Sequence, residues 1–177
     1  MQEAIKIDQQ NGDTQWQDSV KEEMTNNQVA FEKYIGDIKD LVGYEEISAH
    51  LIFDVKMLEN YRRKIRYVAD RHKVETPASV TYSTVVSRDS VRILLMIAAL
   101  NDLDVQGCDA QNAFLTADNL EKHWLCAGPE FGEEEGSIFI VRKALYGLKS
   151  ASASFRSFMA KRFDKLGFKS SHADPDV

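Results

Sequence analysis

Apolar side chains recur at helical spacing near the start of the chain. Trp16, Val20 and Met24 follow one another at intervals of four, which places them on one face of a helix with Asp13 as its candidate N-cap. A second helical stretch is predicted before Gly43, and it carries Phe31, Ile35, Ile38 and Leu41.

Two further helices are predicted in the second half of the chain. Ser87 is a good N-cap, Asp89 lies in the first turn where the helix dipole favours an anion, and the run from Val91 to Leu100 is apolar nearly all round. Such a helix is expected to be buried on most sides. The last helix is predicted near Ser152 to Leu166 and ends at Gly167; its apolar stripe consists of Phe155, Phe158, Met159, Phe163 and Leu166.

Alternating patterns predict strands between these helices. His50 to Val55 and Ile65 to Ala69 read as two strands of a hairpin, with Glu59 and Asn60 between them. Shorter strands are predicted at Asp104–Cys108, Trp124–Cys126 and Ile138–Val141. Helices mixed with antiparallel-looking strands indicate an α+β domain.

Composition narrows the class of protein. The chain has 177 residues, of which 44% are hydrophobic and 28% charged, as in one ordinary soluble globular domain. Its longest strongly apolar run is far shorter than the ~20 residues of a membrane-spanning helix, and its first residues do not resemble a signal peptide. Cys108 and Cys126 are too few for a disulfide scaffold, so we expect an intracellular protein without membrane contact.

The charge is distributed unevenly. The formal net charge is −6, yet Tyr61 to Lys73 carries +5 because six basic residues are opposed only by Asp70. Val141 to Lys169 carries +7, since eight basic residues are opposed only by Asp164. These segments are either solvated basic faces or surfaces that contact phosphate groups.

Two short segments carry candidate chemistry. Asp109 follows a predicted buried strand, where a carboxylate is a cap, an ion-pair partner or a metal ligand. Phe114 comes five residues later and either packs in the core or forms a wall beside whatever Asp109 binds. The turn at Gly147 is flanked by basic residues, so it either receives phosphate or simply connects a strand to a helix; the basic residues are Arg142, Lys143 and Lys149. The histidines and cysteines show no zinc spacing, and no phosphate-loop or dinucleotide motif occurs.

The order of these segments resembles the reverse transcriptase of copia-type retrotransposons. The resemblance runs from about Trp16 to Val177 and rests on CDAQNAFL followed downstream by VRKALYGLKS, together with IFDVK, RRKIRYVA and ETPASVTYSTVVSRDSVRILLMIAALNDLDV, and a W…A/S-V…E pattern from Trp16 to Glu23. It implies a partial right-hand polymerase fold, with fingers-like parts at about 13–86 and 120–150 and palm-like parts at about 87–119 and 151–177. It also implies DNA synthesis on an RNA or DNA template-primer from deoxynucleoside triphosphates with two Mg²⁺ ions.

The resemblance assigns roles to individual residues. Asp109 matches the first catalytic, metal-binding aspartate, and the backbone carbonyl of Ala110 the adjacent ligand. Phe114 matches the aromatic gate under the sugar of the nucleotide. Further matches are the triphosphate cations Lys64 and Arg66, the nucleotide and template contacts Tyr146 and Gly147, and the nucleic-acid contacts Lys149, Arg142 and Lys143.

One motif of that family does not occur in this sequence. Its Tyr-x-Asp-Asp hairpin, which supplies the second and third carboxylates, has no counterpart because no Asp-Asp pair is present. One carboxylate cannot hold two divalent ions, so we expect a chain that does not polymerise DNA by itself, has uncovered apolar helix faces and is of marginal stability. The alternative hypothesis is a nucleic-acid-binding module without catalysis, supported by the two basic segments.

Overall fold

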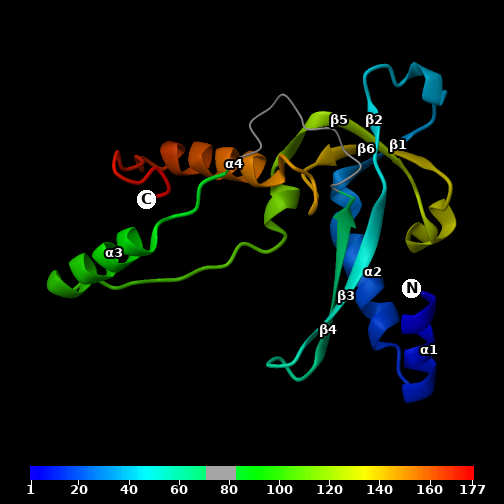
Figure 1. Ribbon diagram of the computed structural model, residues 1–177, viewed down its shortest axis with the longest axis horizontal. Helices are drawn as coiled ribbons and strands as arrows, with labels where there is room; N and C mark the ends of the chain where they lie inside the picture. Colours follow the sequence, from blue (N-terminus) through cyan, green and yellow to red (C-terminus); the bar gives the residue numbers. More distant parts are fainter. Residues whose placement is uncertain (71–82) are drawn as a thin grey trace.

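The computed structural model describes residues 1–70 and 83–177, and its elements fall into two groups (Figure 1). The body, residues 1–70 and 113–150, contains the sheets and the N-terminal helices. The arm, residues 83–112 and 151–177, extends to one side and contains two helices. The α+β class is confirmed, whereas residues 71–82 lie outside the described residues; they include Arg71, Lys73 and the first eight residues of the ETPASVTYSTVVSRDSVRILLMIAALNDLDV segment.

The N-terminal helices are joined by a buried carboxylate. Helix α1 is Gln2–Asn11 and helix α2 is Gln15–Asn27. The side chain of Asp8 accepts the backbone N–H groups of Trp16 at 3.1 Å and Gln17 at 3.0 Å, so the free N–H groups of α2 are satisfied from α1. Burial raises the pKa of Asp8, but these hydrogen bonds more than offset it and hold the pKa below its usual value. The prediction that Asp13 is the N-cap of this helix is wrong. Thr14 occupies the N-cap position but makes no capping hydrogen bond with its side chain, and the carboxylate of Asp8 accepts the N–H groups instead.

The prediction of a helix before Gly43 is wrong as well. Phe31–Tyr34 forms strand β1, which follows the short 3-10 helix η1 (Gln28–Ala30) and precedes η2 (Ile38–Asp40). Strand β1 pairs antiparallel with β6, and the Phe31 ring lies 5.4 Å from that of Phe131. Ile35 is 93% exposed, so the spacing of four did not mark a buried face. Pairing with a distant strand outweighed the local pattern.

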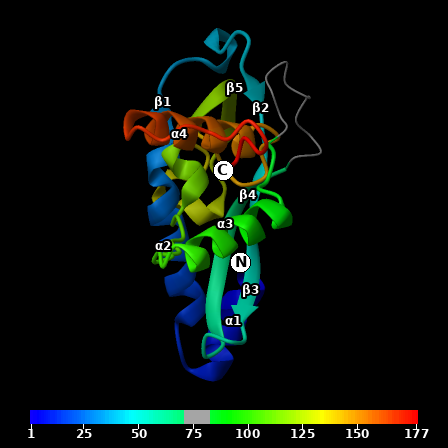
Figure 2. The same cartoon turned by 90° about the vertical axis from the view of Figure 1, so that its left-hand side faces the viewer.

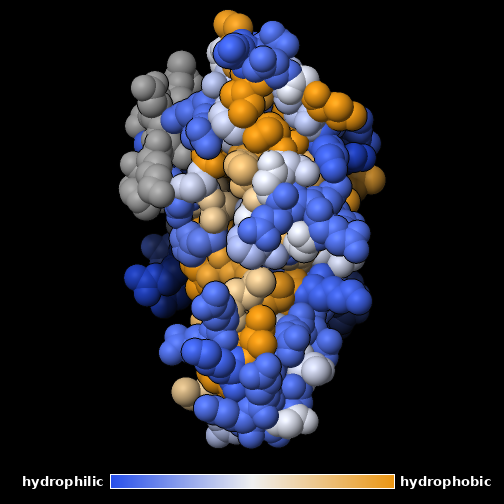
Figure 3. Space-filling view, turned by 90° about the vertical axis from the view of Figure 1, so that its right-hand side faces the viewer, coloured by the Kyte–Doolittle hydropathy of each residue, from blue (hydrophilic) through white to orange (hydrophobic). Residues whose placement is uncertain are grey.

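The body is built on a four-stranded sheet with the order β1-β6-β5-β2. Strand β5 is Asp118–Cys126, β6 is Ile138–Lys143 and β2 is Glu45–Glu46, with the 3-10 helix η5 (Pro129–Glu134) between β5 and β6. These strands confirm the predictions at Trp124–Cys126 and Ile138–Val141. The main core lies on one face of this sheet and includes Ile47, Tyr67, Leu125, Val141 and Leu145. Viewed from the side opposite the arm, the surface is mainly hydrophilic, with a band of apolar residues through its middle (Figure 3).

The predicted hairpin is confirmed. Strands β3 (Ala49–Lys56) and β4 (Arg62–Ala69) pair antiparallel along their whole length. Asn60 and Tyr61 both have positive φ, and the N–H of Arg62 donates to the carbonyl of Glu59 at 3.1 Å. Two consecutive left-handed residues give the turn the twist of the flanking strands.

Helix α3 (Arg88–Leu100) begins as predicted, with the Ser87 hydroxyl accepting the N–H of Ser90 at 3.0 Å. The prediction that it is buried on most sides is wrong, because Ala98 is its one buried residue. The prediction of a strand at Asp104–Cys108 is wrong too, because residues 104–108 are irregular and exposed. No strand in the described part of the chain lies beside that segment to pair with it. It leads into the 3-10 helix η4 (Ala113–Thr116).

Helix α4 (Ala151–Lys165) ends in a Schellman motif at Gly167, whose φ is 89°. The N–H of Phe168 donates to the carbonyl of Phe163, that of Gly167 donates to Asp164, and the two phenyl rings lie 5.8 Å apart. Phe155 and Phe158 pack against the main core, whereas Phe163 is exposed.

The C-terminal tail connects the two helices of the arm. Asp174 accepts the N–H of Ser87 at 3.0 Å and the hydroxyl of Ser90 at 2.6 Å, and Asp176 accepts the Nε–H of Arg156 at 2.5 Å. Figure 2 shows α4 above α3 with the C-terminus between them.

Candidate functional site

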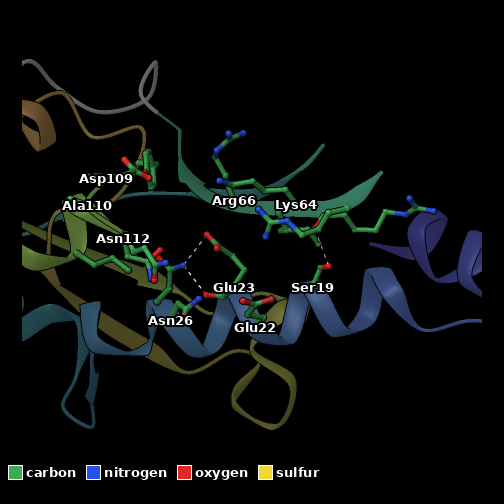
Figure 4. Close-up of a pocket in the computed structure, with 16 residues that line it drawn as sticks. Ser19, Glu22, Glu23, Asn26, Lys64, Arg66, Asp109, Ala110 and Asn112 are labelled. Atoms are coloured by element: carbon green, nitrogen blue, oxygen red, sulfur yellow. Dashed lines mark hydrogen bonds between the residues drawn. The ribbon is translucent and has the colours of Figure 1, made fainter. Parts of the chain in front are cut away.

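A polar hollow of about 360 Å³ lies between the hairpin, helix α2 and the segment that precedes η4. Most of its lining comes from three stretches of sequence that lie far apart, and Leu115 and Tyr146 complete it (Figure 4). The hairpin contributes Arg62 to Arg66, helix α2 contributes polar and acidic side chains, and the segment before η4 contributes Asp109 to Asn112. The body and the arm meet at this hollow.

The alternation of β4 separates its cations from its core residues. Ile65 and Tyr67 are buried, at 4% and 1% exposure, so Lys64 and Arg66 share the opposite face of the strand. Arg66 lies 3.8 Å from Asp54 across the hairpin, and both side chains are partly exposed, which makes this a weak pair. Lys64 has no ion pair within the described ranges. Both cations are therefore available to an anionic ligand.

The outer edge of β4 is held by side chains from α2. The carboxylate of Glu23 accepts the N–H of Tyr67 at 2.8 Å, and the hydroxyl of Ser19 reaches the carbonyl of Arg63 at 3.4 Å. Asn27 in turn donates to Glu23 at 3.0 Å. Satisfying these groups fixes the position of the strand that carries Lys64 and Arg66. Sequence reasoning did not assign a role to Glu23 or Ser19; the signal available was the glutamate that ends the W…A/S-V…E pattern.

Asp109 and Ala110 lie on the exposed segment that leads to η4, across the hollow from Arg66 (Figure 4). Tertiary structure thus brings Asp109 and Ala110 to the same hollow as Lys64 and Arg66. Glu22 and Glu23 also line the hollow, from α2. However, within residues 1–70 and 83–177 no three His, Cys, Asp or Glu side chains are close enough together to hold a metal ion. The residues present do not fit a pair of Mg²⁺ ions.

The turn at Tyr146 and Gly147 attaches the hairpin to the rest of the body. The carbonyl of Tyr146 accepts the N–H of Ala69 at 2.7 Å. Gly147 has a φ of 93°, and a Cβ at this position would collide with the backbone of Ala69. Both the left-handed conformation and this close approach require glycine.

Phe114 stands beside the hollow and does not line it. Its ring lies 4.7 Å from that of Tyr146, which does line the hollow, and 6.2 Å from that of Phe155. Phe114 is half-buried against the main core. In this structure Phe114 packs against the ring of Tyr146 and does not itself contact the hollow.

The predicted nucleic-acid contacts on β6 are engaged in ion pairs. Arg142 binds Glu32 at 2.6 Å and Lys143 binds Asp118 at 2.7 Å, on a largely exposed surface. The hydrogen bond from Arg142 holds the pKa of Glu32 below its usual value. Lys149 is half-buried beside the start of α4. Two of these three cations thus contribute less positive field than the sequence predicts.

The chain belongs to the reverse transcriptase family. The family described as reverse transcriptase (RNA-dependent DNA polymerase) matches residues 38–176, more than half of the chain. This match includes the hairpin, Asp109 and the turn at Gly147. No helix in the described part of the chain is long and apolar enough to cross a bilayer.

The curated relatives indicate the copia type. The chain is 36% identical over 103 residues to the retrovirus-related Pol polyprotein from transposon TNT 1-94 of Nicotiana tabacum, covering 54% of this chain and 7% of that protein. It is 29% identical over 99 residues to the Pol polyprotein from transposon RE1 of Arabidopsis thaliana, again 7% of that protein's length. The corresponding protein from transposon RE2 is 28% identical over 99 residues. No solved structure matches the chain significantly.

Proposed function

We propose that this chain supplies the incoming-nucleotide side of a copia-type reverse transcriptase site. The observation that carries the proposal is that Asp109 and Ala110 line the same hollow as Lys64 and Arg66. A deoxynucleoside triphosphate is strongly anionic, and Lys64 and Arg66 offer ammonium and guanidinium donors to its phosphates. Tyr146 supplies an aromatic surface at the edge of the hollow.

The division into body and arm supports a fingers and palm arrangement. The body includes most of the residues assigned to fingers, 13–86 and 120–150, and the arm most of those assigned to palm, 87–119 and 151–177. In this arrangement the hairpin carries the triphosphate cations, and the arm carries Asp109. The hollow then lies where the two parts meet, which is where a polymerase of this family brings nucleotide and template together.

The chain by itself is proposed not to polymerise DNA. Reverse transcriptases depend on divalent ions, and these are held by convergent carboxylates. Within the described residues, Asp109 is not part of any group of three His, Cys, Asp or Glu side chains that could hold a metal ion. We therefore assign this chain nucleotide positioning and template contact, and derive no step through a metal.

Binding of a fluorescent dATP analogue, followed by anisotropy at low salt, tests the proposal. Arg66→Ala and Lys64→Ala are each expected to weaken binding by about tenfold, or about 1.4 kcal/mol, because each removes a charge-assisted contact. The control is Lys33→Ala, which removes a lysine paired with Glu134 far from the hollow. Equal affinity of the Arg66 variant and the control would refute the nucleotide site, and primer extension that depends on Asp109 would refute the proposed inactivity.

A further inference from the structure

A second hollow lies between helix α4 and the start of β5. Its volume is about 290 Å³, and none of its residues lines the nucleotide hollow. Its lining combines hydroxyl, aromatic and basic side chains, namely Ser154, Ser157, Phe158, Lys161, Arg162 and Lys165 from α4 and Asp118 and Leu120 from β5.

The cations of this hollow are free. Lys161 and Lys165 lie one turn apart on α4, on the side that also carries Ser154 and Ser157. Neither lysine has an ion pair within residues 1–70 and 83–177. The guanidinium of Arg162 lies over the Phe158 ring at 4.9 Å, which fixes its position at the rim without neutralising it.

The local charge is strongly positive. Asp118 is the one carboxylate in the lining, and it is bound to Lys143 at 2.7 Å. Together with Lys143, the three cations of α4 are thus opposed by a single carboxylate. Positive charge concentrated in a hollow attracts polyanions more strongly than the net charge of the chain indicates.

A buried hydroxyl without a partner lines the same hollow. Ser154 is 6% exposed, and its Oγ has no hydrogen-bond partner. A buried polar group left unpaired costs free energy, so this O–H is a donor that lacks an acceptor. Phosphate oxygens are strong acceptors, and the cations around Ser154 select for an anion.

We propose that this hollow binds a backbone phosphate of a nucleic-acid strand. Ser154 and Ser157 donate hydroxyl hydrogen bonds, and Lys161, Arg162 and Lys165 supply the charge. The row of cations extends along the helix and continues to Lys143, which suits a polymer of phosphates better than one free anion. This proposal rests on the proposed function, because the nucleic-acid strand would be the template or the primer. The residues that bind the phosphate are different from those that line the nucleotide hollow.

Anisotropy of a labelled RNA–DNA hybrid with the full chain tests this site. The double variant Lys161→Gln/Lys165→Gln is expected to weaken binding by about tenfold at low salt and to lower the slope of log affinity against log salt by about two, because two phosphate contacts are lost. Ser154→Ala is expected to weaken binding by about threefold without changing the slope, since it removes a neutral donor. Circular dichroism and thermal melting confirm that each variant is folded.

The matched control is Lys6→Gln/Lys21→Gln, which removes the same charge from helices α1 and α2. If the α4 variant binds the hybrid as tightly as this control, the proposal is overturned. Inorganic phosphate at equal phosphate concentration is expected to compete at least tenfold less well than an unlabelled hybrid; equal competition would overturn the polymer assignment. Binding of the dATP analogue is expected to be unchanged in the α4 variant, so loss of hybrid binding with intact nucleotide binding separates failure of this proposal from failure of the proposed function.

Discussion

The body and the arm contain the same kinds of apolar residue, but these residues differ in how deeply they are buried. In the body, Leu125 and Leu145 are at most 1% exposed, whereas in the arm Leu95 and Ile93 are about half exposed, at 50% and 52%. Helix α3 forms because its local signals are good, including the Ser87 cap and an uninterrupted run of apolar residues. Local signals produce a helix, but burial needs a facing surface. The described part of the chain provides one for the body and for the first half of α4, which packs on the main core, but not for most of α3.

The arm is tied to itself by polar contacts, whereas the body is tied together by packing. Asp174 holds the start of α3, and Asp176 holds α4 through Arg156. Partly exposed polar contacts of this kind contribute little free energy compared with a buried core. The two regions should therefore respond very differently to equivalent substitutions.

The largest expected difference is between two leucines. Leu145→Ala should lower the free energy of unfolding by about 2–5 kcal/mol, because Leu145 is fully buried and its removal leaves a cavity. Leu95→Ala should change it by less than about 0.5–1 kcal/mol, because the side chain is half exposed. Urea denaturation monitored by circular dichroism measures both. Equal effects would show that α3 is buried in solution and would remove the contrast between the regions.

Gly147→Ala should have the next largest effect, about 2–3 kcal/mol. The substitution combines a φ of 93° with a collision against Ala69 at the joint between the turn and β4. Gly136→Ala is the control, because Gly136 has a φ of 79° but open space around its Cβ position. It should cost about 1 kcal/mol. A Gly147 variant no less stable than the Gly136 variant would contradict the close approach.

Glu23→Ala should destabilise the body by about 1–3 kcal/mol, since it leaves the buried N–H of Tyr67 without an acceptor. It should also weaken binding of the dATP analogue, because Lys64 and Arg66 lie on the strand that Glu23 holds. Glu22→Ala, which lines the same hollow without such a bond, should do neither. Chemical denaturation and nucleotide binding on the pair of variants separate strand positioning from a general loss of negative charge.

The smallest effect concerns the attachment of α3 and depends on pH. Hydrogen bonds from Ser90 and Ser87 hold the pKa of Asp174 below its usual value. The attachment is therefore fully present above the usual aspartate pKa of about 4, and it is lost as the pH falls from there through the lowered pKa of Asp174 in the folded protein. At pH 7, Asp174→Ala should lower hydrogen-exchange protection in the first turn of α3 by about threefold while leaving the body unchanged. Unchanged protection at pH 7 would show that the tail does not hold α3.

Several of the elements that the sequence predicted correctly are specified by local chemistry. The cap at Ser87, the hairpin connection predicted around Glu59 and Asn60, and the end of α4 at Gly167 each depend on residues close together in the chain. The failures occurred where a distant partner decided the outcome. Phe31 is in a strand because β6 lies beside it, and Asp104–Cys108 is irregular because no described strand does.

The candidate site shows the same division. The resemblance singled out Lys64, Arg66 and Asp109, and the structure places all three around one hollow. It did not indicate that Glu23 holds β4, or that Arg142 and Lys143 are occupied by Glu32 and Asp118. Nor did the pattern reveal the unpaired hydroxyl of Ser154 among free cations, since pairing across elements is not visible in a linear sequence.

The sequence by itself determined the family, the α+β class, the Ser87 cap of α3 and the end of α4 at Gly167, because motifs and local backbone preferences are properties of neighbouring residues. Tertiary structure alone decided which apolar faces are buried, which cations are free and which side chains meet at a hollow. Burial and ion pairing depend on what packs against each residue, and those partners lie on strands and helices far away in the chain.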